Sequence, residues 1–259
     1  MIQKNKQIFI INILLGIFIL LSNSYSFSII KSSPTDLFNG EKLGPNVFLN
    51  ESEIDNFLIN SVFIGDSVTK GFENYCMQRN TSYLSQIKFL TVISLSTNIC
   101  LHPDWTKIPY PLYLGKRYPI WESINLMQAK NTFICLGVND LESFTIEETF
   151  IYYKELIDKI KSFAPDTNIH LITMTGAYKG VSVYKLNREN IKIFNDTLKV
   201  FAKENEVGFI DVYSKLIDEN GDLKGIYSTD KYVHLSDSAY EIILNTLRDY
   251  IRKVPNDIQ

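Results

Sequence analysis

The chain has 259 residues, of which 45% are hydrophobic and 21% are charged, a composition that favours one globular domain and excludes a disordered protein. The formal net charge is −3 and no lysine and arginine cluster follows the first 31 residues, which excludes a nucleic-acid partner. No histidine pair or carboxylate cluster has the spacing of metal ligands, so we expect neither a metal nor another cofactor.

Residues 1–30 have the layout of a targeting segment. Lys4 and Lys6 precede an apolar run at 8–21, and small serines follow it, as in a secretory signal peptide. A run of fourteen residues is short for a bilayer span, but residues 27–30 could prolong the run and leave an uncleaved membrane anchor through residues 7–30. Both alternatives predict that the rest of the protein is extracytoplasmic, either secreted or held at the outer face of the membrane.

Residues 31–50 are polar and are interpreted as a linker to a single domain at 51–259. In that domain, short apolar runs lie at 61–64, 90–93, 132–136, 169–174 and 209–212, and amphipathic helical stretches lie near 146–163, 187–205 and 236–253. Runs of this length, apolar on both faces, suit buried parallel strands. The alternation predicts a three-layer α/β/α sandwich of the flavodoxin-like kind, with a mostly parallel five-stranded sheet.

Three cysteines are present, and none of their spacings suggests a metal site. Cys135 lies within an apolar run, where we expect a buried thiol that packs as a small hydrophobic side chain. A disulfide between Cys76 and Cys100 is an alternative that no sequence feature supports.

Residues with reactive side chains follow the predicted strands. In an open parallel sheet, ligands bind beyond the carboxyl ends of the strands. The first run is followed by Gly65-Asp66-Ser67, and the third by Gly137-Val138-Asn139-Asp140. Taken alone, the first motif could equally be a turn with Asp66 or Ser67 as the helix cap, and Asn139 and Asp140 would more often be turn and capping residues.

Histidine is scarce, which narrows the choice of a general base. His170 lies inside a predicted strand and is expected in the core, and His102 lies in a loop where a surface position is expected. His234 lies just before the last predicted helix, which Ser236 could cap. A serine hydroxyl needs a neighbouring base to become a nucleophile, so Ser67 and His234 form the candidate pair.

These residues resemble the motifs of the SGNH or GDSL hydrolases, over a region from about Glu51 to Arg252. Gly65-Asp66-Ser67 is similar to the first block of that family, and Gly137 to Asp140 is similar to the third. The resemblance implies that Ser67 is the nucleophile and His234 the general base. It also implies that the Ser67 N–H and the Asn139 amide donate to the oxyanion.

Two positions depart from the family pattern. The second block normally supplies a glycine whose N–H donates to the oxyanion, and the best match here is Ser94, which keeps that donor if the local backbone does not require glycine. The family acid usually precedes the histidine by three residues, whereas Asp230 precedes His234 by four. Either the loop bulges so that Asp230 reaches the ring, which we favour, or a backbone carbonyl orients His234 in a serine–histidine dyad.

Other hydrolytic and nucleotide-binding motifs are absent. The order Lys70-Gly71 after Gly65 is not that of a phosphate-binding loop, and Thr69 replaces the second glycine of the α/β-hydrolase motif around Ser67. The segment 101–121 is rich in aromatic and proline residues. We expect Trp105 and Tyr110 in this segment to bind substrate, the alternative being a loop that packs its own aromatic residues.

Together these features predict an enzyme, a serine esterase that hydrolyses small O-acyl esters through Ser67, His234 and Asp230. The exported position and the resemblance imply a small ester or an acetylated cell-wall or surface glycan as substrate. Two alternatives stay open: an O-acetyltransferase that uses the same site, and a non-catalytic glycan-binding or scaffolding module on the same fold. The sequence leaves the oligomeric state open.

Overall fold

The computed structural model describes residues 48–79 and 81–254. The predicted signal peptide or anchor at 1–30 lies outside these residues, as does most of the predicted linker at 31–50. Among the residues described, no helix is both long enough and apolar enough to cross a bilayer.

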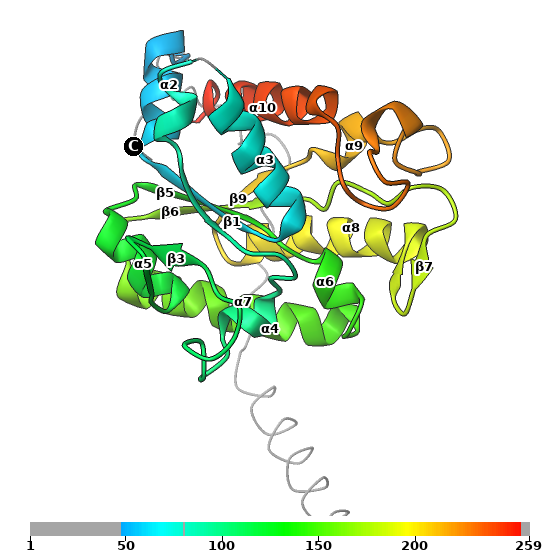
Figure 1. The fold of residues 1–259 in the computed structure, drawn as a ribbon, viewed down its shortest axis with the longest axis horizontal. Coiled ribbons are helices and arrows are strands. Elements are labelled where there is room, and N and C mark those ends of the chain that lie inside the picture. Colours follow the sequence, from blue (N-terminus) through cyan, green and yellow to red (C-terminus); the bar gives the residue numbers. More distant parts are fainter. Residues whose placement is uncertain (1–47, 80, 255–259) are drawn as a thin grey trace, which may run out of the picture. The chain divides into compact units, whose positions relative to one another are not determined.

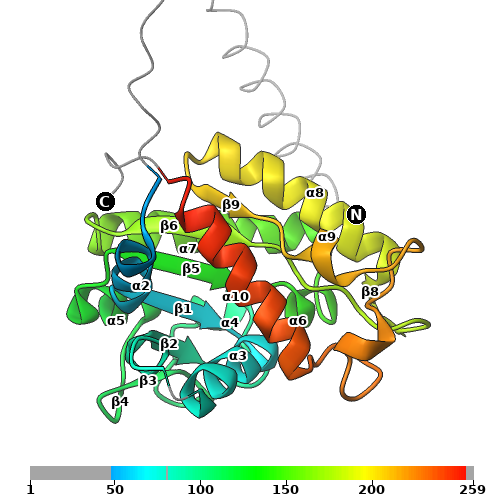
Figure 2. The same cartoon turned by 90° about the horizontal axis from the view of Figure 1, so that it is seen from above.

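A central sheet of five parallel strands organises the fold (Figures 1 and 2). The strands are β1 (Ser61–Gly65), β2 (Lys88–Thr91), β5 (Asn131–Cys135), β6 (Asn168–Ile172) and β9 (Gly208–Ile210), and they lie in the order β2-β1-β5-β6-β9. Every pairing between neighbours is parallel. The chain places β2 on one side of β1 and then crosses over to place β5 on the other side. Flavodoxin-like sheets have this order, so the predicted fold class is confirmed.

Helices cover both faces of the sheet, which gives the three layers (Figure 1). One face carries α2 (Glu51–Ile59), α3 (Ser67–Gln78) and α10 (Asp237–Ile251), and the other carries α5 (Ile120–Met127), α7 (Ile146–Phe163) and α8 (Arg188–Glu204). The remaining elements are short: α4 (Thr97–Cys100), α6 (Val138–Leu141), α9 (Tyr213–Leu216), two 3-10 turns η1 (Leu84–Gln86) and η2 (Gly225–Tyr227), and the hairpins β3 (Leu112–Tyr113) with β4 (Lys116–Arg117) and β7 (Ser182–Val183) with β8 (Leu186–Asn187).

Aromatic rings pack between the sheet and the helices α2 and α3. Phe63 of β1 stacks on Phe133 of β5 with ring centroids 4.5 Å apart, and Phe133 stacks on His170 of β6 at 4.8 Å. His170 is only 3% exposed, so its predicted core position is confirmed. Burial lowers its pKa to about 4, and the ring is therefore a neutral packing residue at physiological pH.

Local sequence accounts for the ends of the long helices. Thr145 and Glu148 form a capping box at the start of α7, which fixes that helix at the predicted residues. Ser236 occupies the N-cap position of α10 but makes no capping bond there. Its hydroxyl instead contacts the Ile226 carbonyl oxygen at 3.1 Å, so the capping role expected for Ser236 was wrong.

The second strand is displaced from its predicted position. The apolar run 90–93 predicted a strand that ends at Ile93, whereas β2 ends at Thr91 and the Ile93 side chain is 70% exposed. The adjacent Ser94 has a φ of 64°, in the left-handed region that a strand cannot adopt. The backbone therefore leaves the sheet two residues earlier than hydropathy alone suggests.

All three cysteines are free, so Cys76 and Cys100 do not form a disulfide. Both of these side chains are buried, and Cys135 is partly buried with its Sγ 3.8 Å from the Thr173 carbonyl oxygen. Burial raises the pKa of the Cys76 and Cys135 thiols to about 12. These thiols stay protonated at physiological pH.

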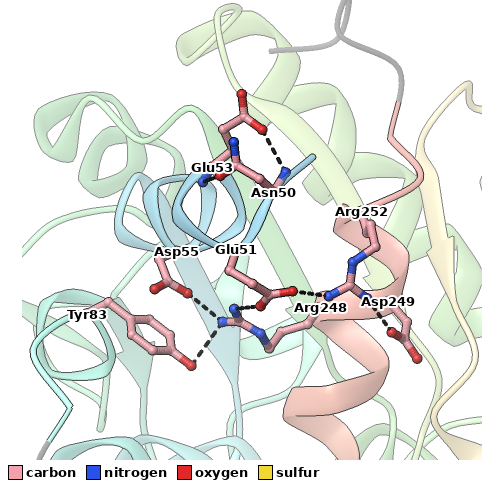
Figure 3. A network of polar contacts seen from close by, with 8 residues as sticks. All are labelled: Asn50, Glu51, Glu53, Asp55, Tyr83, Arg248, Asp249 and Arg252. Atoms are coloured by element: carbon pink, nitrogen blue, oxygen red, sulfur yellow. Dashed lines mark hydrogen bonds and ion pairs between the residues drawn. The ribbon is translucent and has the colours of Figure 1, made fainter. Parts of the chain in front are cut away.

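A network of ion pairs joins α2 to α10 (Figure 3). The Arg248 guanidinium donates to Asp55 at 2.6 Å and to the Tyr83 hydroxyl at 3.0 Å, and it also pairs with Glu51. Arg252 contacts the same Glu51 carboxylate. Because the Arg248 side chain is only 14% exposed, water compensates poorly for the loss of these bonds.

We expect Arg248→Ala to lower the free energy of unfolding by about 2 kcal/mol and the unfolding temperature by about 5 °C. Thermal unfolding followed by circular dichroism measures this change. Lys154→Ala is the matched control, because the Lys154–Asp158 pair is half exposed on both sides and is expected to contribute less than about 0.5 kcal/mol. Equal losses in the two variants would contradict the prediction.

Candidate active site

The turn from β1 into α3 places Ser67 just beyond the carboxyl end of β1. A Cβ on Gly65 would lie 1.9 Å from Thr69 Oγ1 and 2.8 Å from the Cys135 carbonyl oxygen, so only glycine fits this turn. Asp66 is the N-cap of α3, and its Oδ1 accepts the Val68 N–H at 2.9 Å. As the first residue of the helix, Ser67 has an N–H without an intrahelical acceptor, in the positive field of the helix start.

Ser67, His234 and Asp230 form one chain of hydrogen bonds. His234 Nε2 lies 2.9 Å from Ser67 Oγ, and its Nδ1 contacts Asp230 Oδ2. The three residues come from opposite ends of the chain and meet at the carboxyl edge of the sheet. In this arrangement the imidazole can take the hydroxyl proton while the carboxylate stabilises the resulting imidazolium.

The loop before His234 absorbs the extra residue by bulging. Lys231 takes a φ of 57°, and Asp230 Oδ1 accepts the Tyr232 N–H at 2.8 Å. Asp230 thereby reaches the imidazole across a four-residue spacing. Partial burial alone would raise the pKa of Asp230, but the hydrogen bonds from His234 and from the Tyr232 N–H outweigh it, and the pKa lies below its usual value.

Asn139 lies on α6, and its amide contacts the residue before Ser67 and the residue after Ser94. The preceding Gly137 has a φ of 136°, a conformation that side chains rarely adopt, and a Cβ there would also meet Met174. Asn139 Nδ2 donates to Asp66 Oδ2 at 3.2 Å and to the Leu95 carbonyl oxygen at 3.1 Å. Both hydrogens of the amide therefore have protein acceptors, and an oxyanion would have to replace or share one of them.

Ser94, the best match to the missing glycine, adopts a backbone conformation that glycine favours. Its φ is 64°, which costs a non-glycine residue about 1 kcal/mol. Ser94 is exposed, and its N–H has no backbone acceptor among the residues that the structure describes. The strained serine thus keeps a backbone donor close to Asn139, since Leu95 binds the Asn139 amide directly.

Two carboxyl groups near these donors are buried, which the sequence analysis did not predict. Asp66 is 2% exposed, and burial raises its pKa to about 7 despite the bond from the Val68 N–H. Asp140 is fully buried, and burial raises its pKa to about 6 although Thr97 donates to it. The strand-end position of both residues was visible in the sequence, but their burial was not.

We expect Asp66→Asn to change the pH dependence of stability. Between pH 4 and 7 folded Asp66 holds a proton that the unfolded chain, with a pKa near 3.8, has lost. This group therefore stabilises the fold at low pH, and that contribution disappears as the pH rises through about 7. Asparagine keeps the N-cap and stays neutral, so the stability of the variant relative to wild type should rise by about 2 kcal/mol between pH 5 and pH 8.

Urea unfolding at both pH values measures this difference. Asp158→Asn on the exposed face of α7 is the control, and its stability relative to wild type should be the same at the two pH values. An Asp66→Asn variant whose stability also keeps a constant offset from wild type would contradict the prediction.

Tyr110 and Trp105 were predicted to bind substrate, and the structure corrects this for Tyr110. Tyr110 is 3% exposed, and its hydroxyl donates to the Cys100 carbonyl oxygen at 2.7 Å and accepts the Ile120 N–H at 3.1 Å. The Tyr110 hydroxyl therefore makes its hydrogen bonds within the protein core. Trp105 is half-buried and packs against Tyr110 with ring centroids 6.3 Å apart, as in a loop that packs its own aromatic residues; its binding role stays a prediction.

No three histidine, cysteine, aspartate or glutamate side chains in residues 48–79 and 81–254 are grouped so that they could hold a metal ion. The fold and the site together are those of a carboxylic ester hydrolase.

The chain belongs to the GDSL-like lipase/acylhydrolase family, whose sequence model matches residues 63–242. The predicted family is therefore confirmed. No curated protein matches the chain.

Solved structures share the fold at low sequence identity. A GDSL-like lipase from Bacteroides thetaiotaomicron is 16% identical, with a TM-score of 0.55 over 74% of this chain and 87% of that chain. An acetyl xylan esterase is 14% identical, with a TM-score of 0.50 over 72% of this chain and 96% of that one. At these identities the likeness shows the fold alone.

Proposed function

We propose that the protein is a serine esterase that removes small acyl groups, above all O-acetyl groups, from a glycan of the cell wall or cell surface. The observation that carries this proposal is the unbroken hydrogen-bond chain from Ser67 through His234 to Asp230. Such a chain activates a hydroxyl that is otherwise a poor nucleophile.

The first half of the proposed reaction acylates the enzyme. Ser67 Oγ attacks the ester carbonyl carbon while His234 Nε2 takes the hydroxyl proton. The negative charge that forms on the carbonyl oxygen is stabilised by the backbone N–H groups of Ser67 and Ser94 and by the Asn139 amide. The C–O bond of the ester then breaks, and His234 gives its proton to the leaving sugar oxygen.

The second half regenerates the enzyme. Water attacks the acyl carbonyl carbon, His234 takes a proton from that water, and the same donors stabilise the second oxyanion. The bond to Ser67 Oγ breaks, the proton returns to this oxygen, and the free acid leaves. No atom in either half has to come from a cofactor.

The exposure of the site favours water as the acyl acceptor. The side chains of His234 and Asp230 are 44% and 36% exposed, and transfer to a sugar hydroxyl in such an open site would compete with solvent. Placement of the domain outside the cytoplasm rests on the sequence of residues 1–30 and supports an extracellular glycan as the acyl carrier. The extracytoplasmic location is therefore part of the proposal.

The test uses p-nitrophenyl acetate and octanoate beside an acetylated polysaccharide, together with a fluorophosphonate that labels activated serines. We expect faster turnover of the acetate ester, release of free acetate from the polysaccharide, and label on the peptide that contains Ser67. Acetate recovered on an added glycan acceptor instead of in solution would identify an O-acetyltransferase. Neither turnover nor label, with glycan binding intact, would overturn the proposal in favour of a binding module.

A further inference from the structure

The proposed site is built from two segments that the chain connects only at long range. Asn139 lies on α6, and Asp230 and His234 lie in the loop before α10, about ninety residues later. A reaction that needs the base and the oxyanion donor at a fixed separation also needs contacts that hold these segments together.

Tyr232 supplies a direct contact between them. Its hydroxyl donates to the carboxylate of Glu142, the residue at the C-cap of α6. Burial raises the pKa of Tyr232, and the bond to Glu142 raises it further. The phenol therefore stays protonated near neutral pH, where it can donate to Glu142.

The backbone of the same residue is held at two further points. The Tyr232 N–H donates to Asp230 Oδ1 at 2.8 Å, so Tyr232 orients the carboxylate that contacts His234. Its carbonyl oxygen accepts the Tyr178 N–H at 2.7 Å, which ties it to the loop after β6. One residue thus contacts the acid, α6 and the neighbouring loop.

Tyr232 is also one of the three residues between Asp230 and His234, where the family pattern has two. The left-handed φ of Lys231 makes room for the extra residue, and such a bulge has more conformational freedom than the shorter loop. The contact with Glu142 removes part of that freedom.

We propose that Tyr232 and Glu142 are positioning residues that hold the Asp230–His234 pair at its working distance from Asn139. The inference rests on the proposed function, because it assigns the pair a purpose in ester cleavage. Neither residue is expected to contact the substrate or the reacting atoms.

A double-mutant cycle in kcat tests this role. Tyr232→Phe and Glu142→Ala are each expected to lower kcat about tenfold, with KM changed less than about twofold. The double variant should be no slower than either single variant, because both remove the same contact. Glu142→Gln should stay near wild type, since its amide oxygen still accepts the Tyr232 hydroxyl.

Tyr184→Phe is the matched control, because it removes the hydroxyl of a tyrosine that is 61% exposed between β7 and β8. Its kcat should equal that of wild type. Wild-type kcat in Tyr232→Phe, or losses in the two single variants that multiply in the double variant, would overturn the proposal.

Hydrogen–deuterium exchange gives a readout that does not depend on ester turnover. In Tyr232→Phe the amides of Tyr178 and Tyr232 should exchange faster than in wild type, whereas Tyr184→Phe should leave them unchanged. Unchanged exchange in Tyr232→Phe would overturn the positioning role even if the protein is an esterase. Faster exchange in a protein without turnover would instead locate the failure in the proposed function.

Discussion

Replacing Ser67 by alanine is expected to lower kcat for an aryl acetate by at least about 10⁴-fold, with little change in KM. The variant keeps Asp66 as the cap of α3 and gains helix propensity, so the fold should be intact. It loses the oxygen that attacks the ester, and a catalyst without its nucleophile keeps only the contribution of the oxyanion donors. Initial rates over a range of substrate concentrations measure both constants.

Further variants test whether Ser67 acts together with His234. His234→Ala and the Ser67/His234 double variant should be about as slow as Ser67→Ala, because the two residues act as one unit. Ser85→Ala, at an exposed serine in η1, should have wild-type kcat. A Ser67→Ala protein that retains wild-type turnover would exclude Ser67 as the nucleophile.

Asp230→Asn is expected to lower kcat by about 10²- to 10³-fold. The carboxylate accepts the Nδ1–H of His234 and leaves Nε2 free to take the Ser67 proton, whereas an asparagine amide can donate to Nδ1 and favour the wrong tautomer. The 36% exposure of the Asp230 side chain lets water replace part of the lost interaction. We therefore expect a smaller effect than for Ser67→Ala.

The division of the effect between kcat and KM checks this cause. If Asp230 stabilises the imidazolium that forms as Ser67 attacks, its replacement should lower kcat and leave KM nearly unchanged. Asp104→Asn, at an exposed loop position, is the control. Unchanged turnover in Asp230→Asn would favour a serine–histidine dyad in which Asp230 only shapes the loop.

The strands of the sheet could be predicted because buried parallel strands need apolar residues on both faces. The error at β2 arose where this rule fails, since Ile93 is apolar but exposed beside a left-handed Ser94. The helix α3 gave no clear periodic signal. It contains Thr69 and Gly71, which are weak helix formers, and the close approach of Tyr240 to Gly71 is a tertiary contact that no local pattern shows.

The candidate site, like the fold, could be predicted only in part. Ser67 and Asn139 follow strands and His234 precedes the last helix, and from these positions the sequence predicts that the three residues meet at one edge of the sheet. The burial of Tyr110, the bond between Asp66 and Asn139, and the contact between Tyr232 and Glu142 depend on side chains that meet across 10 to 90 residues of chain. Only the folded structure shows these contacts.

The three free cysteines bear on where the protein can be made and used. Thiolate is the form that reacts with oxidants and disulfides, and the Cys76 and Cys135 thiols, with pKa values of about 12, almost never adopt it near neutral pH. The described fold therefore contains no disulfide that an oxidant or an isomerase would have to form. Enzyme produced in a reducing host cytosol should contain the same three thiols as enzyme that matures in an oxidising compartment.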